Sequence, residues 1–131
     1  MKGERLERAM RGPLRRRMLL GLVFRAMPRA VRRKALEREQ VVIEWRITDR
    51  ADGRHDVRQL VIEDGAATMV PGEPREADLI LFADGASFLL LATGNASGPK
   101  LYVSGKVSFE GDPWLAMRLP RLFGGPPAAR E

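Results

Sequence analysis

The sequence predicts an α+β domain, with a mainly antiparallel sheet of about five strands covered on one face by helices. Two observations predict this fold. Apolar residues before residue 40 recur at helical spacing, whereas from Val41 onward they alternate in short segments separated by turns. Most of the predicted strands are consecutive in the sequence, and further helices follow them. This order is typical of helices packed on one face of an antiparallel sheet.

The first 40 residues predict helices. Residues 2–10 favour a short exposed helix, because glutamates precede arginines by four positions. Pro13 suits the first position of a second helix, and residues 14–27 are apolar around most of its circumference. We expect Pro28 to break or restart this helix and helical structure to continue from Arg29 to Glu39.

The middle of the sequence predicts four strands. Residues 41–48 alternate, with Trp45 and Ile47 on one face and charged residues on the other. Asp64-Gly65 is a strong hairpin signal between the second and third strands. The expected strands are residues 41–48, 57–63, 66–70 and 77–83.

The last third predicts two helices and further extended structure. Asp84 can cap a helix over residues 85–93 that ends at Gly94. Residues 101–103 and 106–110 are expected to be extended, with Gly105 as a bulge between them. Asp112 and Pro113 are suited to begin a final helix, which Pro120 should bend or end.

Composition narrows the class of protein. A chain of 131 residues suits one domain, and the absence of cysteine removes disulfides, thiolate metal sites and cysteine nucleophiles. No apolar run approaches the roughly 20 residues that a membrane span needs. We expect a cytoplasmic protein that meets membranes peripherally, with a basic helical segment at 1–38, a body at 39–124 and a flexible tail at 125–131.

Charge is concentrated at the N-terminus. Residues 1–40 hold 13 Lys or Arg against 4 Glu, a net charge of +9, whereas the remainder has a net charge of −3. Such a segment attracts nucleic acid, anionic lipid or an acidic protein, although a solvated helix face has the same composition. It lacks interleaved aromatic residues, which argues against specific nucleic-acid binding and leaves salt-sensitive nonspecific binding open.

The sequence contains no recognisable catalytic motif. His55 is the only histidine and lies in a polar turn, where one histidine with loop carboxylates makes a poor metal site. There is no Gly-x-Ser-x-Gly elbow and no phosphate-binding loop. Neighbouring carboxylates such as Glu63 and Asp64 lie in turns. Neither an enzyme, a metal nor a cofactor is therefore indicated.

Ordered motifs over about residues 20–123 resemble the sterol carrier protein (type 2) family of lipid-binding domains. They are Ala77-Asp78-Leu79-Ile80-Leu81, Phe88-x-x-Leu91-x-x-Gly94, the run from Tyr102 to Asp112 containing Gly105-Lys106 and Gly111-Asp112, and the ending Leu119 to Phe123. The chain departs from the family at Tyr102-Val103, where Phe-Met is frequent, and at Pro113-Trp114. It lacks a Ser-Lys-Leu-type ending.

This resemblance implies an apolar tunnel between sheet and helices that holds a fatty acid, acyl-CoA, phospholipid or sterol. The expected ligand contacts follow the inward strand face and the helix stripes, although core packing is the simpler role for any one of them. They are Trp45, Ile47, Leu60, Ile62, Phe88, Leu91, Val103, Phe109, Trp114 and Met117.

Basic residues near the N-terminus are expected to hold the protein against an anionic membrane or partner. They are Arg15, Arg16, Arg17, Arg25, Arg29, Arg32, Arg33 and Lys34. The favoured function is non-catalytic lipid binding or transfer between membranes. Two alternatives remain: an accessory module that presents an apolar substrate to a partner enzyme, and nonspecific association with nucleic acid through the basic segment.

Overall fold

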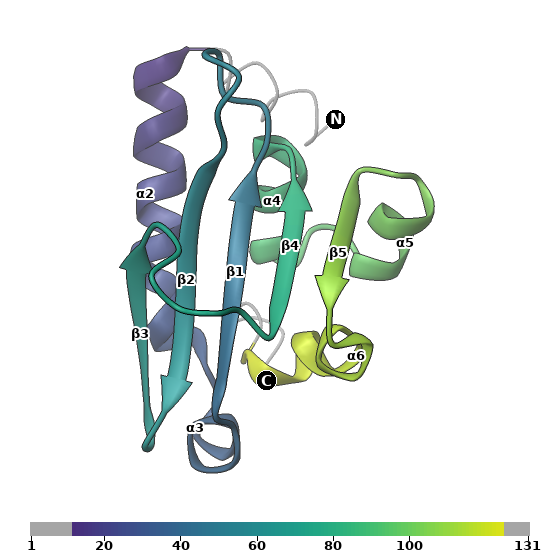
Figure 1. The fold of residues 1–131 in the computed structure, drawn as a ribbon. Helices are drawn as coiled ribbons and strands as arrows, with labels where there is room; N and C mark the ends of the chain where they lie inside the picture. Colours follow the sequence, from purple (N-terminus) through teal and green to yellow (C-terminus); the bar gives the residue numbers. More distant parts are fainter. Residues whose placement is uncertain (1–11, 125–131) are drawn as a thin grey trace.

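A five-stranded sheet is the framework of the fold (Figure 1). The computed structural model describes residues 12–124, so the helix expected at 2–10 and the tail at 125–131 lie outside it. The strand order is β3-β2-β1-β4-β5, with β1 and β4 parallel and every other neighbouring pair antiparallel. The strands are β1 (Val41–Ile47), β2 (Asp56–Glu63), β3 (Ala66–Pro71), β4 (Leu79–Ala83) and β5 (Val107–Gly111).

Helices cover one face of this sheet, as expected. They are α2 (Pro13–Ala30), α3 (Arg33–Arg38), α4 (Gly85–Ala92), α5 (Gly98–Val103) and α6 (Pro113–Leu122). Figure 1 shows α2 and α4 behind the strands, where α2 packs against β2 and β3 and also against α4. The helices and the sheet share one core, to which α2 and α3 contribute alongside α4 and α6.

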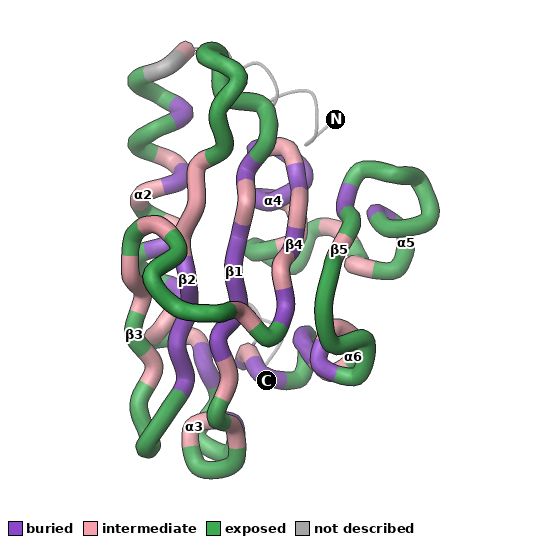
Figure 2. Tube along the Cα trace, viewed as in Figure 1, coloured by how far each residue is buried: buried purple, intermediate pink, exposed green. Residues whose placement is uncertain are grey.

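The inner face of the sheet forms the centre of the core. Figure 2 shows buried segments concentrated along β1, β2 and β4. Ile43, Trp45 and Ile47 alternate along β1 and face Leu60 and its neighbours on β2. The alternation predicted from residue 41 is thereby confirmed.

Tight turns fix the register of the strands. Asp64 and Gly65 connect β2 to β3 with φ values of 52° and 79°, the left-handed pair that a two-residue hairpin needs. At the end of β5, Gly111 has φ 109°, and a Cβ built there would lie 2.5 Å from the carbonyl oxygen of Asp78. Asp112 follows as the cap of α6 and accepts from the N–H groups of Trp114 and Leu115.

The outer face of the sheet is partly covered by the crossover loop, residues 72–78, which joins β3 to β4 and crosses in front of the strands in Figure 1. Gln59 is fully buried beneath it. The Gln59 side-chain amide donates to the Arg75 carbonyl oxygen at 2.7 Å and accepts from the Arg75 N–H at 3.2 Å. It also donates to buried Glu44, which pairs with Arg46. A buried polar network therefore holds this loop against the sheet.

Two expectations about the segment after α4 are wrong. Residues 101–103 are helical, because α5 begins after Ser97, whose side chain accepts from the Lys100 N–H. Gly105 is not a strand bulge. It follows the helix with φ 80°, and the next N–H donates back to the Leu101 carbonyl oxygen in a helix-ending turn.

Two prolines do not end their helices. Pro28 lies inside α2 and Pro120 lies inside α6, whereas the sequence suggested a break or bend at each. Each proline removes one main-chain N–H donor, and each helix ends two residues after its proline. The interruption near Pro28 comes instead at Val31 and Arg32, between α2 and α3.

Candidate functional site

A cleft of about 900 Å³ opens at the end of the sheet where β1 and β4 finish and β2 begins. It lies between the N-terminal half of α2, the β1–β2 loop and the beginning of α4. Its polar lining comes from four arginines and four aspartates, and its apolar lining from α2 and α4. The lining residues are Arg16, Arg17, Leu20, Gly21, Phe24, Asp49, Arg50, Ala51, Asp52, Asp56, Arg58, Asp84 and Ala86.

Arg16 joins α2 to both ends of the β1–β2 loop. It is only 7% exposed, and its guanidinium donates to Asp49 at 2.9 Å and to Asp56. Burial alone would lower the pKa of Arg16, but the hydrogen bonds and charges of Asp56 and Asp49 outweigh it and leave that pKa above its ordinary value. Arg16 is therefore charged at every physiological pH.

Two aspartates organise the beginning of α4 at the same cleft. Asp49 accepts from the Gly85 N–H at 2.9 Å, and Asp84 caps the helix by accepting from the Ser87 N–H at 2.8 Å. These contacts confirm the cap predicted at Asp84. They also mean that the first turn of α4 already has its anionic partners.

The floor of the cleft leads to an aromatic cluster. The ring centroid of Phe24 lies 5.0 Å from that of Phe88, which lies 5.5 Å from that of Trp45. Arg58 sits above the Phe24 ring at 5.5 Å. Trp45 Nε1 and Arg16 Nε are buried without a hydrogen-bond partner among residues 12–124. Of the three rings, Phe24 lines the cleft, whereas Phe88 and Trp45 are buried in the core beneath it.

Seven of the ten expected ligand contacts lie in or against the core. Trp45, Ile47, Leu60, Ile62 and Phe88 are buried in it. Leu91 and Phe109 are half-buried and pack against it. Of these seven, Trp45 and Phe88 belong to the aromatic cluster beneath the cleft.

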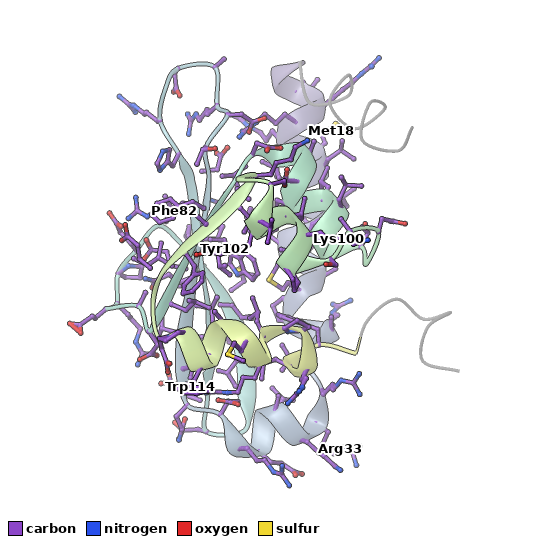
Figure 3. The ribbon with its side chains drawn as sticks, turned by 90° about the vertical axis from the view of Figure 1, so that its right-hand side faces the viewer. Met18, Arg33, Phe82, Lys100, Tyr102 and Trp114 are labelled. Carbon is purple, nitrogen blue, oxygen red and sulfur yellow. The ribbon has the colours of Figure 1, made fainter. Side chains whose placement is uncertain are left out.

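The other three expected contacts are on the exterior. Val103 is 84% exposed, and Trp114 and Met117 are each 71% exposed, so none lines the interior. The reason is local: α5 and α6 bury other positions, Leu101 on α5 and Leu115 and Leu119 on α6. Figure 3 shows Trp114 at the beginning of α6 and Tyr102 on α5, on the side of the molecule formed by β5 and these two helices.

Seven of the eight basic residues expected at a membrane or anionic partner are exposed. They are Arg15, Arg17, Arg25, Arg29, Arg32, Arg33 and Lys34, and Arg33 is labelled on α3 in Figure 3. Arg16 is the exception, because it is buried and paired with two carboxylates. The outer face of α2 also exposes three large apolar side chains at four-residue intervals, Leu14, Met18 and Leu22.

Of the thirteen residues that line the cleft, only Arg16 and Arg17 were among the expected site residues. Arg58 and Phe24 are two of the missed residues for which the sequence held a signal. Arg58 alternates with Leu60 and Ile62 and therefore lies on the inner face of β2. Phe24 follows Leu20 by four residues on the buried row of α2. Continuing that row back by four residues reaches Arg16, which identifies it as an inward arginine. Extending the alternation of β2 and the buried four-residue row of α2 by one position each would have identified these residues.

Within residues 12–124, no group of three or more histidine, cysteine or carboxylate side chains is placed to hold a metal ion. The same residues include no helix that is long and apolar enough to cross a bilayer.

Comparisons with known proteins identify the family and the fold. Residues 23–124 match the model of the SCP-2 sterol transfer family. A curated relative, hydroxysteroid dehydrogenase-like protein 2 of Xenopus tropicalis, is 26% identical over 102 residues, which are 77% of this chain and 24% of that protein. The chain therefore spans about a quarter of the length of the curated relatives it matches.

Solved structures share the same fold at low sequence identity. Sterol Carrier Protein 2 Like 2 of Aedes aegypti has a TM-score of 0.64 at 18% identity, covering 82% of this chain and 98% of that one. The inverting sec-alkylsulfatase Pisa1 of Pseudomonas sp. has a TM-score of 0.64 at 16% identity, covering 76% of this chain but 15% of that one. The same architecture therefore occurs as a nearly whole protein and as a small part of a larger enzyme.

Proposed function

This chain belongs to the SCP-2 sterol transfer family, and from that premise we propose that it binds a lipid and carries it between membranes without chemical change. The observation that carries this proposal is the cleft whose floor leads to Phe24, Phe88 and Trp45. Such a site offers an apolar environment behind a polar mouth, the usual arrangement for a small amphipathic ligand.

Burial of the apolar chain would supply the affinity. Each CH₂ group removed from water contributes about 0.8 kcal/mol, so a 16-carbon chain gains on the order of 12 kcal/mol. A lipid that leaves a bilayer already has that gain, and its transfer into the protein is then close to neutral. The proposed contacts are the buried aromatic pair Trp45 and Phe88, with Ile47, Leu60 and Ile62 around them.

The proposed membrane contact is the outer face of α2. Leu14, Met18 and Leu22 are exposed there, with Arg25 and Arg29 continuing the same face. Each basic side chain that reaches an anionic surface contributes about 1 kcal/mol. We propose that this activity takes place in the cytoplasm, at the membrane surface.

Native mass spectrometry of the gently purified protein, followed by organic extraction, tests lipid binding. We expect a discrete added mass that is lost on denaturation and identified as a lipid. Protein that stays unliganded after incubation with fatty acids, acyl-CoAs, phospholipids and sterols would contradict the proposal.

Vesicle flotation tests the membrane contact separately. Binding should increase with anionic lipid content and weaken as salt is added. Replacing Arg25 and Arg29 together by glutamine should weaken binding several-fold, whereas Arg121→Gln, on α6, should change it little. If vesicle binding changes with neither anionic lipid content, nor salt, nor the double substitution, α2 does not have this role.

A second candidate is an accessory module that docks on a partner enzyme and presents an apolar substrate. It is favoured by the exposed side chains of Val103, Trp114 and Met117. The partial coverage of much longer relatives points the same way. A stable heteromeric complex that dissociates on replacing Trp114 and Met117 by serine, with no lipid bound, would favour this candidate over the first.

A further inference from the structure

We propose that the cleft holds the anionic head of an amphiphile, a carboxylate or phosphate group, and that Arg58 is its principal contact. The inference rests on the proposed lipid binding and narrows the class of lipid. It selects fatty acids and phosphate-headed lipids over neutral sterols and alcohols.

The position of Arg58 is the first argument. Arg58 lies on the inner face of β2, opposite Trp45 on β1, and is followed on that face by Leu60 and Ile62, which are fully buried. It is half-buried at the cleft, where a guanidinium loses part of its hydration and needs a compensating partner. A charge on the core side of a sheet is unusual enough to need such an explanation.

The partners of Arg58 do not neutralise it. One guanidinium nitrogen donates to the Val57 carbonyl oxygen at 2.9 Å, and the group lies 5.5 Å from the centroid of the Phe24 ring. Within residues 12–124, no carboxylate forms an ion pair with it. Its remaining donors are suited to a carboxylate or phosphate, which a guanidinium can bind with two parallel hydrogen bonds.

The aspartates of the cleft are already engaged. Asp49 and Asp56 pair with Arg16, and Asp52 pairs with Arg50. Asp84 accepts from both the N–H and the hydroxyl of Ser87. None of these four carboxylates is therefore left to serve as the counterion of Arg58.

Two further arginines have unsatisfied donors at the same cleft. Arg16 Nε is buried without a partner in residues 12–124, although its other nitrogens are ion-paired. Arg17 is exposed on the rim and forms no ion pair within that range. Arg16 Nε, buried beneath the opening, and the Arg17 guanidinium at its rim are thus further donors that suit an anion.

The apolar interior fixes the orientation of the ligand. Phe24 lies directly beneath Arg58 and contacts Phe88, which contacts Trp45. These three rings are packed in the core and each is at most 5% exposed, so an acyl chain attached to a head at Arg58 would have to part them to pass from the cleft into the core. A free anion would contact only the polar residues of the cleft, and a neutral lipid would contact only the aromatic cluster.

Calorimetric titration with three 16-carbon ligands tests the inference. Palmitate and hexadecyl phosphate should bind the natural protein about 10- to 100-fold more tightly than hexadecanol, the range expected for hydrogen bonds to a charged group. Arg58→Met should remove this preference and leave hexadecanol binding unchanged. Arg54→Met, on an exposed loop residue that does not line the cleft, is the matched control and should change neither.

A second variant keeps the test valid if Arg58→Met does not fold. Arg58→Lys retains the charge but not the planar pair of donors, so it should lose part of the preference. Equal binding of palmitate and hexadecanol by the natural protein would overturn the inference and leave lipid binding intact. Binding of none of the three would reject the proposed function as well. If inorganic phosphate binds as tightly as hexadecyl phosphate, the cleft is a site for a free anion and the proposal of an amphiphilic ligand is overturned.

Discussion

Arg16 has the most unexpected environment among the basic residues of α2. Its charge and its two arginine neighbours, Arg15 and Arg17, suggested that it belongs to a solvent-facing cluster of charges. Instead its row on the helix is buried, and Asp49 and Asp56 come from opposite ends of one loop to meet it. The charge thus ties the first half of α2 to the sheet, which is a stabilising role inside the domain.

Removing Arg16 should therefore be far more destabilising than removing its neighbour. Arg16→Met removes the buried partner of Asp49, whose side chain is 39% exposed, and of Asp56, which is 21% exposed and keeps a 3.5 Å contact with Arg50, so we expect a loss of about 1–3 kcal/mol in the free energy of unfolding. Arg17→Met, at an exposed position, should change it by less than about 0.5 kcal/mol. Urea denaturation of both variants measures the difference, and equal values would show that the ion pair does not hold α2.

Gly111 gives a second prediction at the scale of one residue. Its φ of 109° is disfavoured for other residues, and an added Cβ would overlap the Asp78 backbone at 2.5 Å. Gly111→Ala should cost about 3 kcal/mol or more, since strain and a backbone clash combine. Gly105→Ala, where φ is also positive but the surrounding space is open, should cost only about 1–2 kcal/mol.

Thermal and urea unfolding of these two glycine variants should follow that order. Gly98→Ala is the control, because its φ is not positive and the nearest atom to an added Cβ, on Leu91, is at an ordinary contact distance of 3.7 Å. A loss at Gly105 as large as that at Gly111 would mean that backbone conformation alone, and not the close approach to Asp78, decides the cost. In the Gly111-Asp112 motif, Gly111 therefore permits close packing against the Asp78 backbone, and Asp112 caps α6.

At the scale of elements, the crossover loop depends on one buried amide. Gln59 satisfies both main-chain groups of Arg75 and also donates to Glu44. Gln59→Leu keeps the volume but leaves these groups unpaired, so we expect a loss of about 2–4 kcal/mol in stability. Thr68→Ala, exposed on β3, should cost less than about 0.5 kcal/mol.

Hydrogen exchange separates a local from a global effect of Gln59→Leu. The Arg75 N–H should lose protection by more than the global destabilisation explains, because its acceptor is removed. If residues 72–78 exchange no faster than the sheet in this variant, the network does not hold the loop.

The elements predicted from periodicity and turn chemistry are largely the ones observed. Alternation at residues 41–48 and the Asp64-Gly65 pair depend on local rules, and both were confirmed. Residues 101–103 were mispredicted because Leu-Tyr-Val favours a strand. In the structure, Ser97 caps a helix and Pro99 lies in its first turn, and this helix includes residues 101–103. A short helix with a strong cap overrides such propensities.

Prediction of the site was less complete, for a physical reason that operates at the scale of the whole molecule. Periodicity tells which residues share a face but not which face of a short helix meets the core. Trp114 and Met117 lie on the exposed side of α6, whereas Leu115 and Leu119 are buried. The core-facing residues of β1 and β2 were identified because alternation along a strand places Trp45 and Ile47, and Leu60 and Ile62, on one face.

The whole molecule offers a direct reporter for ligand binding, because its two tryptophans have opposite environments. Trp45 is buried in the aromatic cluster and Trp114 is exposed. In Trp114→Phe, Trp45 is the only tryptophan left, so any change in tryptophan emission on adding palmitate comes from the interior. We expect a saturable change in this variant.

The same titration predicts a coupled gain in stability. A ligand that binds only the folded state adds about 2.7 kcal/mol at a free concentration one hundred times its Kd, which corresponds to a Tm increase of about 10 °C for a domain of this size. Trp114→Phe should show the emission change and the Tm shift at the same palmitate concentrations, because one binding event causes both. A Tm shift without an emission change would place the ligand away from Trp45, on the exposed surfaces of α2, α5 or α6. In that case the aromatic cluster would serve only as core, and the protein would act by docking and not by carrying a lipid inside.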